Sequence, residues 1–273
     1  MKFKYIFIIF NILIILFLLV VALMPVIVLG PDFAGKIWST SWPLALVLVI
    51  AMISLNAFFL SNRRLFRLLE REDWPALVDY LEHRVLDTGR YSARLVKLLV
   101  NSYLIMSDSE GVLRLEKKLS LEKPDFVEKN ALVFGAARIL GGDAAGAANF
   151  FAARLEKGGS KDAQWIRWYY GFSLLLCGNY EKAEAEFRAL ASAGDDAIAA
   201  GLSAWFLSDT LLKYSTDPDE CLAIAEQGRG RIEKALKKIE GWNKEAAKVE
   251  TEIHGAVIKK YIDGAAMWLF AKE

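Results

Sequence analysis

The side chains that most often carry catalysis or bind metals are few and scattered in this sequence. Its only histidines are His83 and His254, and no Cys-x2-Cys or His-x3-His spacing accompanies either. The glycine pairs at 141–142 and 158–159 are not followed by the Lys-Ser or Lys-Thr of a phosphate-binding loop. Carboxylates are abundant but belong to charged helix faces, whereas catalytic carboxylates sit in apolar pockets. We therefore predict no catalytic residues, no metal site and no cofactor, which favours a binding protein over an enzyme.

Cysteine usage and net charge exclude two further classes. Cys177 and Cys221 both lie in apolar helical contexts, which favour small buried side chains over a disulfide. The chain has 34 Lys and Arg against 33 Asp and Glu, so no large basic field indicates nucleic-acid binding. Hydrophobic residues make up 55% of the 273 residues, and the excess lies before residue 61. This excess indicates a membrane segment.

Two uncharged apolar runs occupy the N-terminal part of the chain. Residues 5–29 form a run of 25 residues, about 37 Å long at 1.5 Å per residue, enough to cross a hydrocarbon core of about 30 Å. Residues 42–60 form a second run of 19 residues, joined to the first by a short polar connector at 30–41. The first run is too long for a signal peptide and no Ala-x-Ala site follows it. We predict a transmembrane hairpin over residues 1–62.

Basic residues flank the two outer ends of the predicted hairpin. They are Lys2, Lys4, Arg63, Arg64 and Arg67, whereas the connector carries only Lys36 against Asp32. Positive charge near membrane-spanning segments stays in the cytoplasm. Both termini and the rest of the chain are therefore expected on the cytoplasmic side of a membrane, which we take to be a bacterial inner membrane.

Asn11 and Asn56 are the polar residues at depth in the two runs. They lie about six and about four residues from the cytoplasmic ends, so antiparallel helices would place them within roughly 3 Å of the same depth. We expect their amides to pair between the helices, a contact worth about 0.6–2 kcal/mol. Because neither run contains a charged residue, a transport function is not predicted.

The stretch from Trp165 to Leu190 consists of two amphipathic halves around a turn at 177–180. It contains Tyr170-Gly171, then Leu174, then Ala183-x3-Phe187. This order resembles the tetratricopeptide repeat (TPR), a helix–turn–helix unit of about 34 residues. Arg167 and Asp195 stand where that family has Trp and Pro. The resemblance implies further copies on either side, because one unit cannot bury its apolar face alone.

A second copy precedes the first at a constant interval. Gly135 lies 36 residues before Gly171, and Phe151 lies 36 residues before Phe187. The clearest units are 92–125, 128–161 and 164–197, within a repeat domain at 63–240. We therefore expect an all-α chain, with an N-terminal transmembrane hairpin, a TPR-like α-solenoid and a C-terminal capping helix.

The resemblance to TPR proteins also implies a concave groove lined by the first helices of the units. An apolar, aromatic groove suits a hydrophobic peptide or an amphipathic helix. The alternative is that the same residues are simply core between repeats, and the sequence leaves both interpretations open. The residues concerned are Val96, Val100, Tyr103, Leu132, Ile139, Trp165, Trp168, Phe172 and Leu175.

The last segment, residues 241–273, is predicted to contain one helix over 243–270. Its apolar residues recur every three or four positions: Ile253, Val257, Tyr261, Ala265 and Trp268. So broad an apolar face needs a partner surface. We favour a cap stacked on the last repeat, since solenoids need one. The alternatives are insertion into the aromatic groove and contact with the membrane.

Together these features predict a membrane-tethered scaffold or adaptor that binds a protein partner through a cytoplasmic TPR-like domain. The alternative is an assembly or accessory subunit of a membrane complex, held through its hairpin. The expected contacts are a protein partner and the lipid bilayer, with no nucleic acid. Oligomeric state and the identity of the partner are not encoded in any pattern found here.

Overall fold

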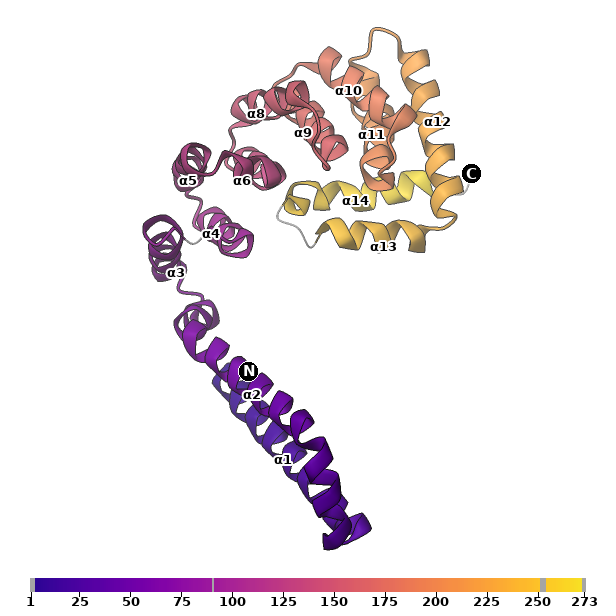
Figure 1. The fold of residues 1–273 in the computed structure, drawn as a ribbon. Helices are drawn as coiled ribbons and strands as arrows, with labels where there is room; N and C mark the ends of the chain where they lie inside the picture. The colour runs from indigo at the N-terminus through magenta and orange to yellow at the C-terminus, as the bar shows by residue number, and fades with distance from the viewer. Residues whose placement is uncertain (1–2, 90, 251–253, 272–273) are drawn as a thin grey trace. The chain divides into compact units, whose positions relative to one another are not determined.

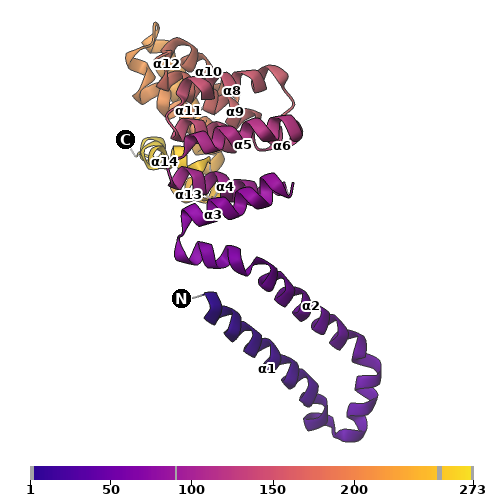
Figure 2. The same cartoon turned by 90° about the vertical axis from the view of Figure 1, so that its left-hand side faces the viewer.

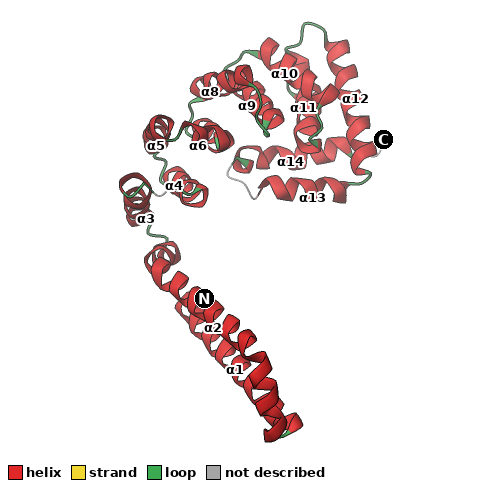
Figure 3. Cartoon of the chain, in the orientation of Figure 1, coloured by secondary structure: helices red, strands yellow, loops and turns green. Residues whose placement is uncertain are grey.

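Every regular element in the described part of the chain is a helix (Figures 1 and 3). The computed structural model describes residues 3–89, 91–250 and 254–271. The chain divides between Arg84 and Val85 into two compact units, later than the boundary at 62 that the sequence predicts. We call residues 1–84 the hairpin unit and residues 85–273 the repeat unit, and describe each by itself.

The hairpin unit is built on two long helices that lie side by side (Figure 2). They are α1 (Phe3–Leu29) and α2 (Pro31–Arg71), followed by the shorter α3 (Trp74–Glu82). The stretches Phe7–Val28 and Leu46–Arg71 are long and apolar enough to cross a membrane, by length and composition. Their apolar side chains are mostly exposed, so this unit leaves a large apolar surface without a protein partner in the described residues.

The prediction of a polar connector at 30–41 is wrong. Gly30, with φ at 82°, alone separates the two helices, and α2 begins directly at Pro31. Proline suits a first helical position because the backbone N–H it lacks has no partner there in any case. The second helix ends at Arg71. Asp73 caps α3, because its side chain accepts a hydrogen bond from the Ala76 N–H at 3.3 Å.

The two asparagines at depth do not use their amides as predicted. The Asn11 amide donates to the carbonyl oxygen of Phe7 at 2.9 Å, and the Asn56 amide donates to that of Met52 at 3.0 Å. Each side chain thus bonds to its own helix, four residues back, where a carbonyl is always within reach. The helices instead meet through aromatic rings, with the Phe7 and Phe59 centroids 5.1 Å apart.

The repeat unit stacks helices in two layers. From α7 to α12 each helix packs on the next, and α9 also contacts both α7 and α11, so that these three form an inner layer. The helices before the C-terminal pair are α4 (Ala93–Ile105), α5 (Ser109–Glu122), α6 (Pro124–Lys129), α7 (Ala131–Leu140), α8 (Ala144–Lys157), α9 (Ala163–Leu176), α10 (Tyr180–Ala193), α11 (Ala197–Asp209) and α12 (Pro218–Leu236). A π-helix, η1 (His83–Asp87), spans the division between the units, and a 3-10 turn, η2 (Leu211–Lys213), follows α11.

Three turns of the repeat unit share one geometry. A residue with positive φ follows each first helix: Ser107 at 57°, Gly142 at 83° and Gly178 at 75°. The next residue precedes the second helix and is Asp108, Asp143 or Asn179. Both aspartates accept a backbone N–H three residues on, at 2.9 Å, which stabilises the helix start. The same turn geometry is therefore shared by the helix pairs α4–α5, α7–α8 and α9–α10.

Close helix contacts depend on glycines that face phenylalanines. A Cβ atom added to Gly135 would lie 2.0 Å from Phe151, and one added to Gly171 would lie 3.2 Å from Phe187. Both phenylalanine side chains are fully buried. The same glycine–phenylalanine pair thus joins the first and second helices of two successive repeats.

We predict that Gly135→Ala lowers the free energy of unfolding by about 1–3 kcal/mol, because the new methyl group overpacks against the Phe151 ring. The matched control is Gly230→Ala in α12, where a Cβ would meet no heavy atom within 4 Å. That change should raise stability by about 0.5–1 kcal/mol through helix propensity. Chemical unfolding of the purified protein, followed by circular dichroism, measures both. Shifts of the same sign and size would contradict the packing described here.

The prediction of a single C-terminal helix over 243–270 is wrong. Two helices are present, α13 (Ile239–Glu250) and α14 (Gly255–Leu269), while residues 251–253 lie outside the described residues. Gly241, expected to break the helical run, is inside α13. The break falls just before it, at Lys237, which adopts φ of 62° and ends α12.

Helix α14 does more than close the end of the repeats. It contacts α7, α11 and α12, and thus lies across the inner layer (Figure 1). Its Tyr261 ring centroid lies 5.5 Å from that of Phe172 and 5.1 Å from that of Phe206. Helix α14 thus packs on α11, where the favoured cap was expected, and also reaches aromatic residues of the predicted groove, which was the alternative.

Candidate functional site: a lysine-lined cavity beside the inner layer

The predicted groove residues are packed rather than open. Trp168, for example, has no exposed surface and stacks on Phe172 at a centroid distance of 5.1 Å. Of the nine predicted groove residues, only Ile139 and Leu175 are more than 8% exposed, and both are half-buried. The buried ones are Val96, Val100, Tyr103, Leu132, Trp165, Trp168 and Phe172. The predicted groove residues therefore belong to the core between helices, and they do not line an open apolar groove.

A histidine from the C-terminal segment closes the aromatic surface. The Tyr169 hydroxyl donates to the carbonyl oxygen of His254 at 2.6 Å and lies 3.2 Å from its Nδ1. The His254 ring also packs against Trp165, with centroids 5.4 Å apart. Burial raises the pKa of Tyr169 well above its usual value, so this hydroxyl stays a neutral donor. Sequence reasoning missed this contact, because a lone histidine carries no spacing signal.

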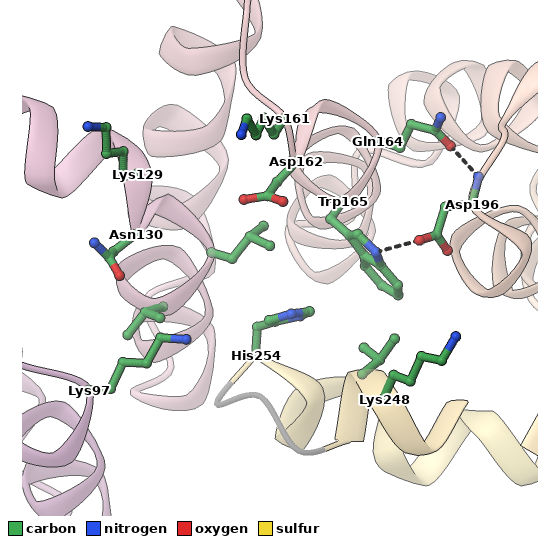
Figure 4. A pocket seen from close by; sticks show the side chains of 13 residues that line it. Lys97, Lys129, Asn130, Lys161, Asp162, Gln164, Trp165, Asp196, Lys248 and His254 are labelled. Carbon is green, nitrogen blue, oxygen red and sulfur yellow. Dashed lines mark hydrogen bonds between the residues drawn. The ribbon is translucent and has the colours of Figure 1, made fainter. Parts of the chain in front are cut away.

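A cavity of about 450 Å³ opens beside this closed surface (Figure 4). Four lysines from four elements line it: Lys97 in α4, Lys129 in α6, Lys161 in the α8–α9 loop and Lys248 in α13. We call it the lysine cavity. Its remaining walls are formed by Asn130, Leu132, Val133, Asp162, Gln164, Trp165, Asp196, Val249 and His254.

Asp196 fixes one side of the lysine cavity. One carboxylate oxygen accepts the backbone N–H groups of Ile198 and Ala199, at 3.0 and 2.9 Å, and so caps α11. The other oxygen accepts the Trp165 indole N–H at 3.0 Å. The Asp196 backbone N–H in turn donates to Gln164 at 2.9 Å. These bonds tie the start of α9 to the start of α11 and hold the Trp165 ring in place (Figure 4).

The α8–α9 loop positions Lys161. Gly158 and Gly159 both have positive φ, 66° and 74°, and end α8. The Ser160 hydroxyl then accepts the Asp162 backbone N–H at 3.2 Å. Such serine turns fix short loops locally, so the loop holds Lys161 at the cavity wall.

The chemistry available at this cavity is anion binding. Lys129 and Lys161 make no ion pair with any residue that the structure describes. Within the same residues no group of three or more His, Cys, Asp or Glu side chains could hold a metal ion. Nearby like charges in a concave site raise the local concentration of anions. Nothing in the sequence pattern indicated this site, because its lysines come from four distant segments.

The cysteines differ from each other in their surroundings. Cys177 was expected to be buried but is exposed, because it lies in the turn between α9 and α10. Cys221 is buried as expected, and burial raises the pKa of its thiol. Neither forms a disulfide.

Comparison with known proteins places the repeat unit in a bacterial family. Residues 111–271 match a family described as uncharacterised Treponema protein, which covers more than half of the chain. The chain belongs to that family. It is also 32% identical over 166 residues to an uncharacterised protein of Treponema pallidum (strain Nichols), a match that covers 61% of this chain and 53% of the relative.

The chain thus spans about half the length of the relative that it matches. No solved structure matches it. The family match runs from α5 to α14, so it includes three of the cavity lysines and His254 but not α1, α2 or Lys97.

We predict that Tyr169→Phe destabilises the packing of α14 on the inner layer. The change removes the buried hydroxyl that donates to the His254 carbonyl oxygen, at a cost of about 1–3 kcal/mol. Hydrogen exchange of residues 255–269 should accelerate relative to that of α8. Tyr170→Phe, at a half-buried neighbour whose hydroxyl makes no hydrogen bond within the described residues, is the control. Equal exchange in both variants would show that this contact does not hold α14.

Proposed function

We propose that this protein is a membrane-tethered scaffold or adaptor whose TPR-like repeat unit binds a protein partner. The observation that carries the proposal is the lysine cavity, a concave charged site on a helical repeat. The predicted apolar groove cannot serve, because α14 lies across it. A partner would therefore contact the repeat unit by polar recognition at the cavity and its rim.

The tether consists of α1 and the apolar part of α2. Two apolar helices joined by a tight turn, with exposed apolar side chains on both, support insertion into a bilayer as a transmembrane hairpin. The basic residues at the outer ends of the hairpin support a cytoplasmic location for both termini and the repeat unit. We propose a bacterial inner membrane as the location of this hairpin.

The alternative role is an assembly subunit held by the hairpin. The family match favours the adaptor, since it covers the repeat unit and leaves out α1 and α2. A function shared within the family would then reside in residues 111–271. The hairpin would supply location rather than recognition.

Topology can be tested with the native cysteine. Cys177 is exposed in the repeat unit and Cys221 is buried, so an impermeant thiol reagent should label wild type only after cells are permeabilised. In a Cys177→Ser background, Lys36→Cys should react in intact cells, because residue 36 lies near the turn between the two apolar spans. Labelling of Cys177 in intact cells, without labelling at position 36, would reverse the proposed orientation.

The two roles can be separated by site-specific photo-crosslinking of the full chain in its native membrane. A crosslinking amino acid at Ala163 reports on the cavity rim, and one at Leu16 reports on the exposed surface of α1. The adaptor role predicts one defined protein adduct from position 163. The assembly role predicts the adduct from position 16 instead.

The control position for this experiment is Ala223, an exposed site on α12 at the outer layer. It should give no defined adduct under either role. An adduct of equal yield from positions 163 and 223 would mean that contact is non-specific, and the adaptor role would then lose its support.

A further inference from the structure

The lysine cavity concentrates positive charge that the composition of the chain conceals. Four lysines line it, although the whole chain has a net charge of +1. Two carboxylates face them, and Asp196 already accepts hydrogen bonds at both of its oxygens. Asp162 is the remaining acidic side chain in the wall. Lys248 is also paired with the Glu245 carboxylate at 2.6 Å, so the ammonium groups that attract a negatively charged ligand are chiefly those of Lys129 and Lys161.

Lys129 and Lys161 are the lysines best placed to contact such a ligand. Both are exposed, and neither makes an ion pair with a residue that the structure describes. They lie on the same side of the cavity, with Lys97 and Lys248 on the other (Figure 4). A ligand lying between the two sides would meet ammonium groups from both.

The walls between the lysines are apolar. Leu132, Val133 and Val249 contribute aliphatic side chains, and Trp165 contributes an indole ring held by Asp196. A small inorganic anion gains nothing from such walls. A peptide does, because its carboxylates can reach the lysines while its methylene groups and backbone pack on the aliphatic and aromatic surface.

A second cavity extends the charged surface along the α8–α9 loop. It has a volume of about 510 Å³ and shares Lys129, Lys161 and Asp162 with the lysine cavity. Its far wall contains Arg154 and Lys157, which pair with Glu128 at 3.4 and 3.6 Å. The two cavities therefore lie next to each other, on either side of these shared residues. An extended chain could place one acidic side chain in each, whereas a compact ligand would fill only one.

We propose that the two cavities together bind an extended acidic peptide segment, with Lys129 and Lys161 at its centre. This inference rests on the proposed function, and it specifies the chemistry of the partner. The ligand carries several carboxylates separated by small or aliphatic residues. One end of the segment lies in the lysine cavity and the other lies along the loop after α8.

The test is binding of a fluorescein-labelled peptide of alternating glutamate and glycine to the full chain in nanodiscs of neutral lipid. The same peptide with glutamine in place of glutamate is the neutral probe. Lys129→Gln/Lys161→Gln should weaken binding of the acidic peptide by at least about tenfold. The matched control, Lys117→Gln/Lys182→Gln, removes two exposed lysines from α5 and α10 and should weaken it by less than about twofold.

Three results would overturn the inference. Equal weakening by both double variants would mean diffuse charge attraction, and equal binding of the glutamine peptide would mean that carboxylates are not recognised. Binding of anionic vesicles but not of the acidic peptide, lost in Lys129→Gln/Lys161→Gln, would assign the site to a membrane surface instead. Circular dichroism spectra like wild type for both double variants ensure that a loss of binding is not a loss of fold.

Failure of this inference can be distinguished from failure of the adaptor role. If position 163 yields its defined adduct in wild type and in Lys129→Gln/Lys161→Gln alike, the adaptor role stands and acidic recognition falls. If position 163 yields no adduct in wild type, the adaptor role itself falls. Loss of the adduct in the lysine variant but not in the control variant supports both.

Discussion

Stacking of the repeats depends on how closely two helices can approach each other. Glycine, which has no side chain, sets that distance at two positions. At Gly135 the Phe151 ring occupies the volume that a Cβ would need, and at Gly171 a Cβ would lie 3.2 Å from the Phe187 ring. These contacts join α7 to α8 and α9 to α10. Because the interior is packed like a crystal, a change in this spacing would propagate to the next hairpin. The surface that α14 covers, and the cavity beside it, depend on this spacing.

Features encoded by neighbouring residues could be predicted from the sequence. The cap at Asp73, the turn before Asn179 and the glycine–phenylalanine interval all involve residues within one hairpin. Such contacts are decided by propensity and spacing, which are visible in a linear pattern. The helical class and the two apolar helices were predictable for the same reason. The turn within 92–125 differs in one residue, because Ser107 takes the positive-φ position that Gly142 and Gly178 hold in the next two turns.

Features that join distant segments could not be predicted. Tyr169 meets a residue 85 positions away, and no periodicity marks His254 as its partner. The same holds for the lysine cavity. Its lysines belong to four elements, and in the sequence each of them looks like an ordinary solvated residue. Asn11 shows a different limit: its amide had two partners within reach, a second helix and its own backbone, and the sequence does not rank them. The structure adds the three-dimensional neighbours that decide such cases.

The long separation between Tyr169 and His254 has a consequence for synthesis on the ribosome. Residues emerge from the N-terminus onward, so α1 and α2 are available for insertion long before the repeats are complete. The hairpins from α7 to α12 can then form one after another, since each packs mainly on its neighbour. Their inner aromatic surface stays uncovered until residues 255–269 have left the exit tunnel. A chain that stops early would expose Tyr169, Phe172 and Phe206 to solvent, the kind of exposed surface that chaperones and proteases recognise.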